Sequence, residues 1–238
     1  MKETTLDIVL PCYNPAPGWV QQITQAYAQL SKLLPETRIH IILVNDGSVK
    51  GISDADIMQL QQDIPACQYH AYTQNTGKGH ALRTGVSKST ADYIIYTDVD
   101  FPYTIDSIFR VYNALYQNQC DIAAGVKDAA YYAHVPPVRR FISKVLRFLT
   151  ASVLRLHISD TQCGLKGFNQ EGKALFVRTQ INRYLFDLEF IYLASRAQQL
   201  TLVPIPVTLR DDVQFSSMRF RTLSQEAWNF IKIVMHSL

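Results

Sequence analysis

The sequence predicts an α/β fold in which a mainly parallel central sheet is flanked by helices and followed by a helical C-terminal elaboration. Short apolar segments alternate with helix-length amphipathic segments through the first half of the chain, and polar clusters directly follow the apolar segments. Strands separated by helices of this length pair in parallel and are covered on both faces. Apolar residues make up 47% of the chain and charged residues 18%, which excludes a disordered protein.

The first half contains five strand-like segments separated by four helical patterns. The strands are expected at 6–11, 39–44, 68–72, 93–97 and 121–125, and the helices at 18–34, 54–63, 80–88 and 104–117. Ligands of such sheets bind beyond the carboxyl ends of the parallel strands. The polar clusters at 45–48 and 98–100 each follow a strand, so we expect the topology to gather them at one edge of the sheet.

The second half follows a different pattern. A basic helix is expected at 138–156, an extended segment at 164–169, a helix at 187–199, a polar mobile loop at 210–221 and an amphipathic helix at 222–236. The strand expected at 200–209 contains Pro204 and Pro206, which favours the edge of a sheet. Neither a repeat nor a linker divides the chain, so residues 1–238 are expected to form a single domain.

Charge and cysteine content exclude several classes of protein. The 23 basic and 20 acidic side chains leave a net charge of +3 over 238 residues, which is too small for a general nucleic-acid binder. The four cysteines form no C-x-x-C pair and the N-terminus has no signal-peptide pattern, so reduced thiols in a cytosolic protein are expected. No segment approaches the roughly 18 apolar residues of a membrane span.

Asp98 and Asp100 form the sharpest chemical signal, a D-x-D at the end of a predicted strand. Strand side chains repeat every second residue, so both carboxylates can point the same way. Two hard oxygen ligands suit Mg²⁺ or Mn²⁺ bound mainly through substrate phosphates. The alternative is an acidic turn in which Asp106 caps or precedes the next helix.

Two further polar loops follow strands. The N-D-G-S cluster at 45–48 is typical of a turn, or else Asp46 accepts a hydrogen bond from a base or a sugar hydroxyl. The Gly-rich segment at 75–83 leads into a helix, and its backbone amides, with Lys78 and Arg83, can hold a diphosphate. This segment lacks the spacing of a P-loop, and a plain loop with two solvated cations is the alternative.

Two of the later helices carry notable charges. The helix at 138–156 presents Arg140, Lys144 and Arg147 on one side and apolar residues on another, which is typical of a helix lying on anionic lipid. The alternative is an ordinary amphipathic helix packed on the sheet. Asp187 is expected to cap the helix that it opens, with Glu189 supporting the helix dipole.

Six motifs, in order along the chain, resemble those of the family 2 glycosyltransferases of the GT-A fold. They are P-C-Y-N at 11–14, V-N-D-G-S at 44–48, N-T-G-K-G-H-A-L-R at 75–83, D-V-D at 98–100, D-T-Q-C-G-L-K at 160–166 and F-D-L-E at 186–189. Each motif alone is weak, but six in the right order are highly specific. Within the family, the chain is most similar to the polyprenyl and dolichyl phosphate sugar transferases, especially the dolichyl-phosphate β-glucosyltransferases.

The resemblance implies a metal-dependent, inverting transfer of a hexose, glucose as first choice, from a UDP- or GDP-sugar to a polyprenyl phosphate. It implies Mg²⁺ or Mn²⁺ on Asp98 and Asp100, and catalytic roles for Asp160 and Asp100. The implied donor-binding residues are Pro11, Tyr13, Asn14, Asp46, Lys78, Arg83, Asp98 and Val99. The implied contacts with the acceptor and its phosphate are Gln162, Lys166, Arg219 and Arg221.

The resemblance also implies a division of labour along the chain. Residues 1–126 would bind the nucleotide, and residues 127–238 would face the acceptor and the membrane. The protein would lie on the cytosolic face of a membrane, where Arg140, Lys144 and Arg147 would contact the lipid. A separate protein could anchor it there, or it could form a homo-oligomer. Asn45, Pro15 and Pro102 depart from the family pattern, and Pro102 stands where the mannose synthases carry a glutamine ligand.

Other functions stay open at this point. A family 2 transferase can act on a polysaccharide or a soluble glycan, and its activity would then not depend on Arg140, Lys144 and Arg147. A non-catalytic protein that binds nucleotide sugars would hold the donor without transferring it. Nucleic acid is not an expected partner, because aromatic and basic residues are not interleaved along an exposed strand pattern.

Overall fold

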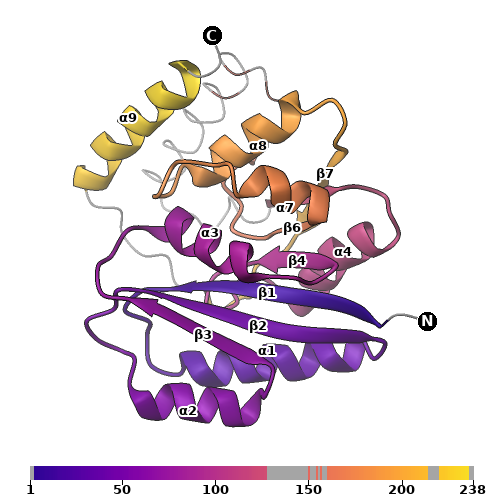
Figure 1. Cartoon of the computed structure of the whole chain (residues 1–238), viewed down its shortest axis with the longest axis vertical. Helices are drawn as coiled ribbons and strands as arrows, with labels where there is room; N and C mark the ends of the chain where they lie inside the picture. Colours follow the sequence, from indigo (N-terminus) through magenta and orange to yellow (C-terminus); the bar gives the residue numbers. More distant parts are fainter. Residues whose placement is uncertain are drawn as a thin grey trace.

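A computed structural model describes residues 3–127, 150, 154, 156, 160–213 and 220–235, without the side chains of 220–225 and 227. Its centre is a seven-stranded sheet with the strand order β3-β2-β1-β4-β6-β5-β7 (Figure 1). The strands are β1 (Thr4–Cys12), β2 (Thr37–Asp46), β3 (Cys67–Tyr72), β4 (Tyr93–Tyr96), β5 (Ile122–Lys127), β6 (Lys166–Asn169) and β7 (Leu202–Val207). The helices are α1 (Trp19–Leu33), α2 (Asp54–Asp63), α3 (Lys78–Lys88), α4 (Ile105–Tyr116), α7 (Gln170–Phe176), α8 (Phe186–Arg196) and α9 (Phe220–Met235).

The strand directions confirm a mainly parallel sheet. Strands β3, β2, β1 and β4 pair in parallel, β6 is antiparallel to both β4 and β5, and β7 pairs in parallel with β5. The register of β1 with β2 ends on Cys12 opposite Asn45, so the loops that follow these two strands begin side by side. Strand β7 lies at the end of the sheet, as its two prolines predict.

Helices cover both faces of the sheet, and the alternation of side chains along β1 shows how. Leu6, Ile8 and Leu10 are fully buried in the core that the sheet forms with α1, α2 and α4. Val9 is buried in the second core, which the other face forms with α3, α7, α8 and α9. A strand buried on both faces explains the continuous apolar run in the sequence of this segment.

Some local expectations were wrong. Strand β4 ends at Tyr96, so residues 98–100 lie in a turn and strand alternation does not align their carboxylates. The helix α4 is capped by Thr104, whose hydroxyl accepts from the Ser107 amide, while Asp106 pairs with Arg110 at 2.9 Å. Because α9 begins at Phe220, Arg221 belongs to a helix rather than to the expected loop.

Several sequence-based expectations fall outside the described residues. The basic helix expected at 138–156 lies almost entirely outside them, so Arg140, Lys144 and Arg147 stay predictions. Arg219 lies outside them as well, and the side chain of Arg221 is not among those described. Among the helices that the structure describes, none combines the length and the apolar content that a membrane crossing requires.

Candidate active site

Asn14 joins the loops that follow β1 and β2. Its backbone has φ 47, and its side-chain oxygen accepts hydrogen bonds from the amides of Val49 (2.9 Å) and Lys50 (3.1 Å). Its own amide donates to the Ser48 hydroxyl at 2.8 Å. Asparagine tolerates the left-handed backbone conformation better than most residues, so it suits this position between the two loops. Among the other residues of the first motif, Pro11 is buried in β1 and the Tyr13 side chain is half exposed.

Asp46 fastens the end of β2 to the Gly-rich loop. Its carboxylate is buried and accepts from the Asn75 side-chain amide (2.7 Å) and from the backbone amides of Thr76 (2.8 Å) and Gly77 (2.9 Å). A carboxylate that accepts several N–H groups forms strong, charge-assisted bonds. Asp46 therefore positions a loop, a role that neither sequence-based alternative, turn residue or base acceptor, included.

The start of α3 is covered by another part of the chain. The carbonyl oxygen of Asn182 accepts from the amides of Gly79 (2.8 Å) and His80 (3.2 Å). A Cβ on Gly77, whose φ is 117, would lie 2.4 Å from this same oxygen, so glycine permits the close approach. The amides of Thr76, Gly77, Gly79 and His80 all have protein partners, so none of these four is an open donor for the expected diphosphate.

Arg83 binds the segment that covers α3. Its guanidinium donates to the carbonyl oxygen of Ile181 at 2.8 Å, to the Thr179 hydroxyl and to the side-chain oxygen of Asn182. Glu189 holds the same segment from the other side, since its carboxylate accepts from the amides of Gln180 and Ile181. The structure thus places Arg83 in a positioning role at the 179–182 segment.

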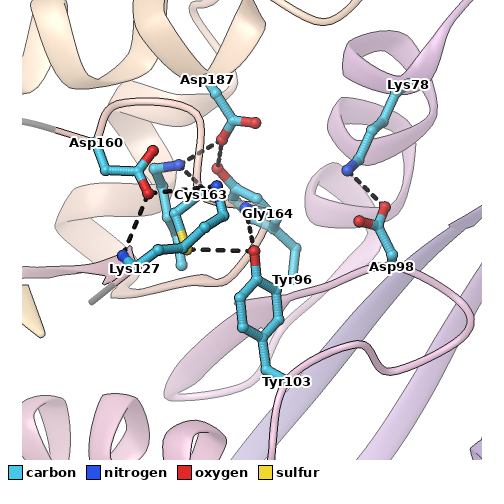
Figure 2. A network of polar contacts seen from close by, with 10 residues as sticks. Lys78, Tyr96, Asp98, Tyr103, Lys127, Asp160, Cys163, Gly164 and Asp187 are labelled. Carbon is cyan, nitrogen blue, oxygen red and sulfur yellow. Dashed lines mark hydrogen bonds and ion pairs between the residues drawn. The ribbon is translucent and has the colours of Figure 1, made fainter. Parts of the chain in front are cut away.

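Lys78 and Asp98 form an ion pair of 2.5 Å between α3 and the turn after β4 (Figure 2). Burial alone would lower the pKa of Lys78. The carboxylates of Asp98 and Asp187 raise it by more, so the pKa of Lys78 lies above its ordinary value. Desolvation and the neighbouring charge of Asp98 both raise the pKa of Asp100. Val99 packs against the core, so it fixes the turn between the two carboxylates.

The D-T-Q-C-G-L-K segment lies directly against this ion pair. A Cβ built on Gly164 would lie 3.1 Å from Asp98 Oδ2 and 3.5 Å from Lys78 Nζ. The Tyr103 hydroxyl accepts from the Gly164 amide at 2.9 Å and from the Cys163 thiol at 3.3 Å (Figure 2). The fold therefore brings together the turn at 98–100, the start of α3 and the 160–166 segment, which lie far apart in the sequence.

Gln162 and Asp160 occupy the same segment. The side-chain nitrogen of Gln162 is buried and has no hydrogen-bond partner among the described residues, and the same holds for the Thr97 hydroxyl beside Asp98. A buried donor without a partner is costly, so these atoms suit a polar ligand. The Asp160 carboxylate lies 3.3 Å from Lys127 Nζ and also accepts from the Lys127 amide.

A buried network behind the site joins β4, β6 and α8. The ammonium of Lys166 is fully buried and lies 2.6 Å from Asp187 Oδ1 and 2.6 Å from the Cys163 carbonyl oxygen. The Tyr96 hydroxyl donates to the same carboxylate oxygen at 2.5 Å, and burial together with Asp187 raises the pKa of this hydroxyl. Asp187 is therefore no helix cap, and Leu185 occupies that position.

Sequence reasoning missed this network although signals for it existed. Lys166 begins β6 directly after the apolar Leu165, and Asp187 lies between the apolar residues Phe186 and Leu188 of α8. A charge within an apolar segment is rarely buried without a partner. The sequence alone offers no means of pairing these two charges, because many other ionic side chains compete for each.

The residues of the D-x-D turn fit a divalent cation. Asp98 and Asp100 supply two hard oxygen ligands. Burial, and after it the neighbouring charge of Asp98, raises the pKa of Asp100, and a bound cation would offset both effects. Pro102 offers no side-chain ligand, and its carbonyl oxygen accepts from the Arg210 amide at 2.9 Å. The described residues contain no cluster of three or more His, Cys, Asp or Glu side chains, so the remaining ligands would be phosphate oxygens and water.

Known sequences include several that are similar to this chain. A dolichyl-phosphate beta-glucosyltransferase of Trichomonas vaginalis is 25% identical over an alignment of 246 positions, which covers 98% of this chain and 72% of that protein. The human dolichyl-phosphate beta-glucosyltransferase is 28% identical over 204 residues, which cover 80% of this chain and 63% of that protein. The Dictyostelium discoideum enzyme of the same name is matched over 62% of its length.

Solved structures share the fold. The glucosyl-3-phosphoglycerate synthase of Mycobacterium tuberculosis superposes with a TM-score of 0.69 at 14% identity, over 98% of this chain and 80% of that one. A mannosyltransferase of Pyrobaculum calidifontis, solved with GDP-Man and Mn²⁺, gives 0.56 at 18% identity, over 94% of this chain and 59% of that one. These neighbours confirm the GT-A fold. Residues 7–174 match the family model of glycosyl transferase family 2, so this chain belongs to that family of glycosyltransferases.

Proposed function

We propose that this glycosyltransferase moves glucose from a nucleotide sugar, UDP-glucose as first choice, to dolichyl phosphate or another polyprenyl phosphate. The observation that carries the proposal is the Asp98–Lys78 pair, held against Gly164 beside the second carboxylate, Asp100. This arrangement suits the diphosphate of a sugar donor. The names of the relatives in Trichomonas vaginalis and human favour glucose and a dolichyl phosphate acceptor.

The donor diphosphate would lie at the D-x-D turn. A Mg²⁺ or Mn²⁺ ion held by Asp98 and Asp100 would supply positive charge that stabilises the leaving diphosphate. Lys78 adds a permanent positive charge, because its pKa is raised above an already high value. Asn14 and Asp46 hold the loops around this position, and Pro11, Tyr13 and Val99 are proposed to line the rest of the donor site. Arg83 supports the donor loop through the 179–182 segment.

The acceptor would supply the nucleophile. A phosphate monoester has a second pKa of about 6, so it is already ionised at neutral pH and needs positioning more than it needs a general base. Its oxygen would form a bond to the anomeric carbon as the bond from that carbon to the diphosphate breaks on the opposite face, which inverts the centre. Asp160 and Gln162 are proposed to lie near this phosphate. Lys166 is proposed to position their segment through its hydrogen bond to the Cys163 carbonyl oxygen.

The location of the acceptor places the enzyme at a membrane. A polyprenyl phosphate lies in the bilayer, so we propose a cytosolic enzyme bound peripherally, with residues 1–126 binding the donor and residues 127–238 facing the lipid. Arg140, Lys144 and Arg147 remain the proposed basic contacts, and Arg219 and Arg221 the proposed phosphate contacts from the C-terminal part. A membrane-anchoring partner or a homo-oligomer is compatible with this arrangement.

A donor panel tests the proposal. The full chain is incubated with UDP-glucose, GDP-mannose or UDP-galactose and with detergent-dispersed dolichyl phosphate, in Mn²⁺, in Mg²⁺ and after chelation. We expect glucosyl lipid from UDP-glucose only with a divalent cation, and a β-linked product. Asp100→Asn should lower the rate about 100-fold or more, because it removes charge that stabilises the leaving group.

Asp106→Asn is the matched control, since this exposed aspartate lies on α4 and pairs only with Arg110 among the described residues. Its rate should equal that of the unaltered chain. Full transfer by Asp100→Asn would refute the metal assignment. Transfer to a soluble glycan in place of the lipid, or donor binding with no transfer to any acceptor, would refute the proposed substrate.

A further inference from the structure

The outer side of α9 carries an apolar stripe that the described part of the chain does not cover. Trp228, Ile231 and Met235 are exposed by 59%, 44% and 67%. Their spacing of three and four residues places them on one face of the helix, which we call the α9 face. Ile233, on the other side of the helix, is buried in the core beneath α8. The helix therefore packs by one side, and its second side presents these three apolar residues, with the exposed Lys232 among them, to its surroundings.

A cavity of about 750 Å³ lies beside the α9 face, between α9, α8 and the 178–183 segment. Trp228 lines it together with Arg178 and Arg183. Within the part of the chain that the structure describes, neither arginine forms an ion pair. The cavity also reaches Thr76, in the Gly-rich loop that precedes Lys78, so it extends from α9 toward the candidate active site.

The two acidic groups near this cavity accept hydrogen bonds from backbone amides, although Oε1 of Glu226 has no partner among the described residues. The Glu189 carboxylate accepts from the amides of Gln180 and Ile181 at 2.8–2.9 Å. Glu226 is buried, and its carboxylate accepts from the Leu185 amide at 3.0 Å. Among the described residues, neither carboxylate forms an ion pair with Arg178 or Arg183. The rim of the cavity therefore offers positive charge beside the exposed Trp228.

We propose that the α9 face and the rim of this cavity dock onto an anionic membrane surface. Trp228, Ile231 and Met235 would enter the boundary between headgroups and acyl chains, where tryptophan is enriched and amphipathic helices lie. Arg178 and Arg183 would bind lipid phosphates, for which the guanidinium fork is well suited. The inference rests on the proposed function only in that a lipid acceptor gives the docking a purpose. None of these five residues belongs to the basic segment expected at 138–156.

Trp228 is itself a reporter of docking. The chain contains two tryptophans, and Trp19 is only 3% exposed. The full chain is mixed with phosphatidylcholine vesicles with or without phosphatidylglycerol, and with the same vesicles carrying brominated acyl chains. These vesicles contain neither acceptor nor donor. We expect a blue shift of the emission and quenching by brominated lipid on the anionic vesicles, with several-fold weaker binding to pure phosphatidylcholine.

Variants locate the contact. Ile231→Glu should weaken vesicle binding about tenfold or more, because it brings an acidic group into the boundary region. Arg178→Gln should weaken it about fivefold, the effect of one basic residue near an anionic surface. Met58→Glu is the matched control: Met58 is 71% exposed on α2, which lies at the opposite end of the molecule from α9 (Figure 1). It should bind like the unaltered chain.

Three outcomes would overturn the docking surface. Vesicle binding that leaves the Trp228 emission unchanged would place the contact elsewhere on the chain. If Met58→Glu weakened vesicle binding as much as Ile231→Glu does, an added negative charge would act regardless of its place on the surface. A dimer that Ile231→Glu dissociates, without binding to vesicles, would assign the α9 face to a second copy. Vesicle binding by a chain that transfers no sugar to any lipid would defeat the proposed function and leave the docking surface intact.

Discussion

Gly164 is the residue at which the backbone of one motif meets the side chains of two others. Its φ is not positive, so alanine is compatible with the backbone, but the added Cβ would lie 3.1 Å from Asp98 Oδ2 and 3.5 Å from Lys78 Nζ. We expect Gly164→Ala to lower the transfer rate about tenfold or more, because displacing a positioned group by a fraction of an ångström is costly to catalysis. The measurement is kcat and KM beside the thermal unfolding midpoint. An unchanged rate would place the reacting diphosphate away from Asp98.

The four cysteines are free thiols that are buried in the fold. Burial raises the pKa of Cys12 and of Cys67 to about 12, and the pKa of Cys120 to about 11. We expect these thiols to react with iodoacetamide at pH 8.5 far more slowly in the folded chain than in urea, because the thiolate is the nucleophile. Mass spectrometry of the labelled peptides measures this. Labelling of Cys12 at the unfolded rate would contradict its burial.

The same pKa values predict the sign of a pH effect. The unfolded thiols titrate near 9.0 and the folded ones higher, so the folded state holds more protons between these values. Their contribution to stability is therefore complete below pH 9 and is lost as the pH rises toward 12. Urea midpoints should fall between pH 8.5 and pH 10.5 by more in the unaltered chain than in Cys12→Ala.

At the scale of elements, buried side chains hold the loops at the carboxyl edge of the sheet. Asp46 accepts three hydrogen bonds from the Gly-rich loop. We expect Asp46→Asn to lower the free energy of unfolding by about 2–4 kcal/mol, because an amide nitrogen would then face N–H donors in a buried position. Urea unfolding measures the change. Asp63→Asn, at an exposed end of α2, should stay within about 0.5 kcal/mol, and equal effects would refute the role of Asp46.

Element boundaries were predictable where the apolar period was long and unbroken. The helix expected at 104–117 is α4, Ile105–Tyr116, and the strand expected at 39–44 is the centre of β2. The helix α7 went unpredicted because it has only seven residues and contains Gly172. The sequence predicts a strand end at 98–100 where the structure has a turn, because sequence alone does not show where a strand stops.

At the scale of the whole molecule, one buried network, the Lys166–Asp187 ion pair with the Tyr96 hydroxyl, joins segments from both halves. Tyr96 belongs to β4, Lys166 to β6 and Asp187 to α8. We expect Lys166→Met to cost about 3–5 kcal/mol of stability, because it leaves the buried Asp187 carboxylate without its cation. The double variant Lys166→Met/Asp187→Leu should lose clearly less than the sum of the two single changes. Urea unfolding of the unaltered chain, the two single variants and the double variant measures the interaction energy. Additive losses would show that the two charges do not interact.

The sequence by itself determined the class of fold, the parallel pairing of the first strands, the edge position of β7 and the family. These follow from local apolar periods, from prolines and from the order of motifs, all of which are written along the chain. Only the tertiary structure decided which polar groups serve as supports. Asp46, Arg83 and Asp187 look like ligand-binding or capping residues in the sequence, yet each is bound to protein atoms that lie 21 to 99 positions away. A carboxylate or a guanidinium offers the same chemistry to a ligand and to a neighbouring loop, so only the folded chain shows which of the two lies within reach.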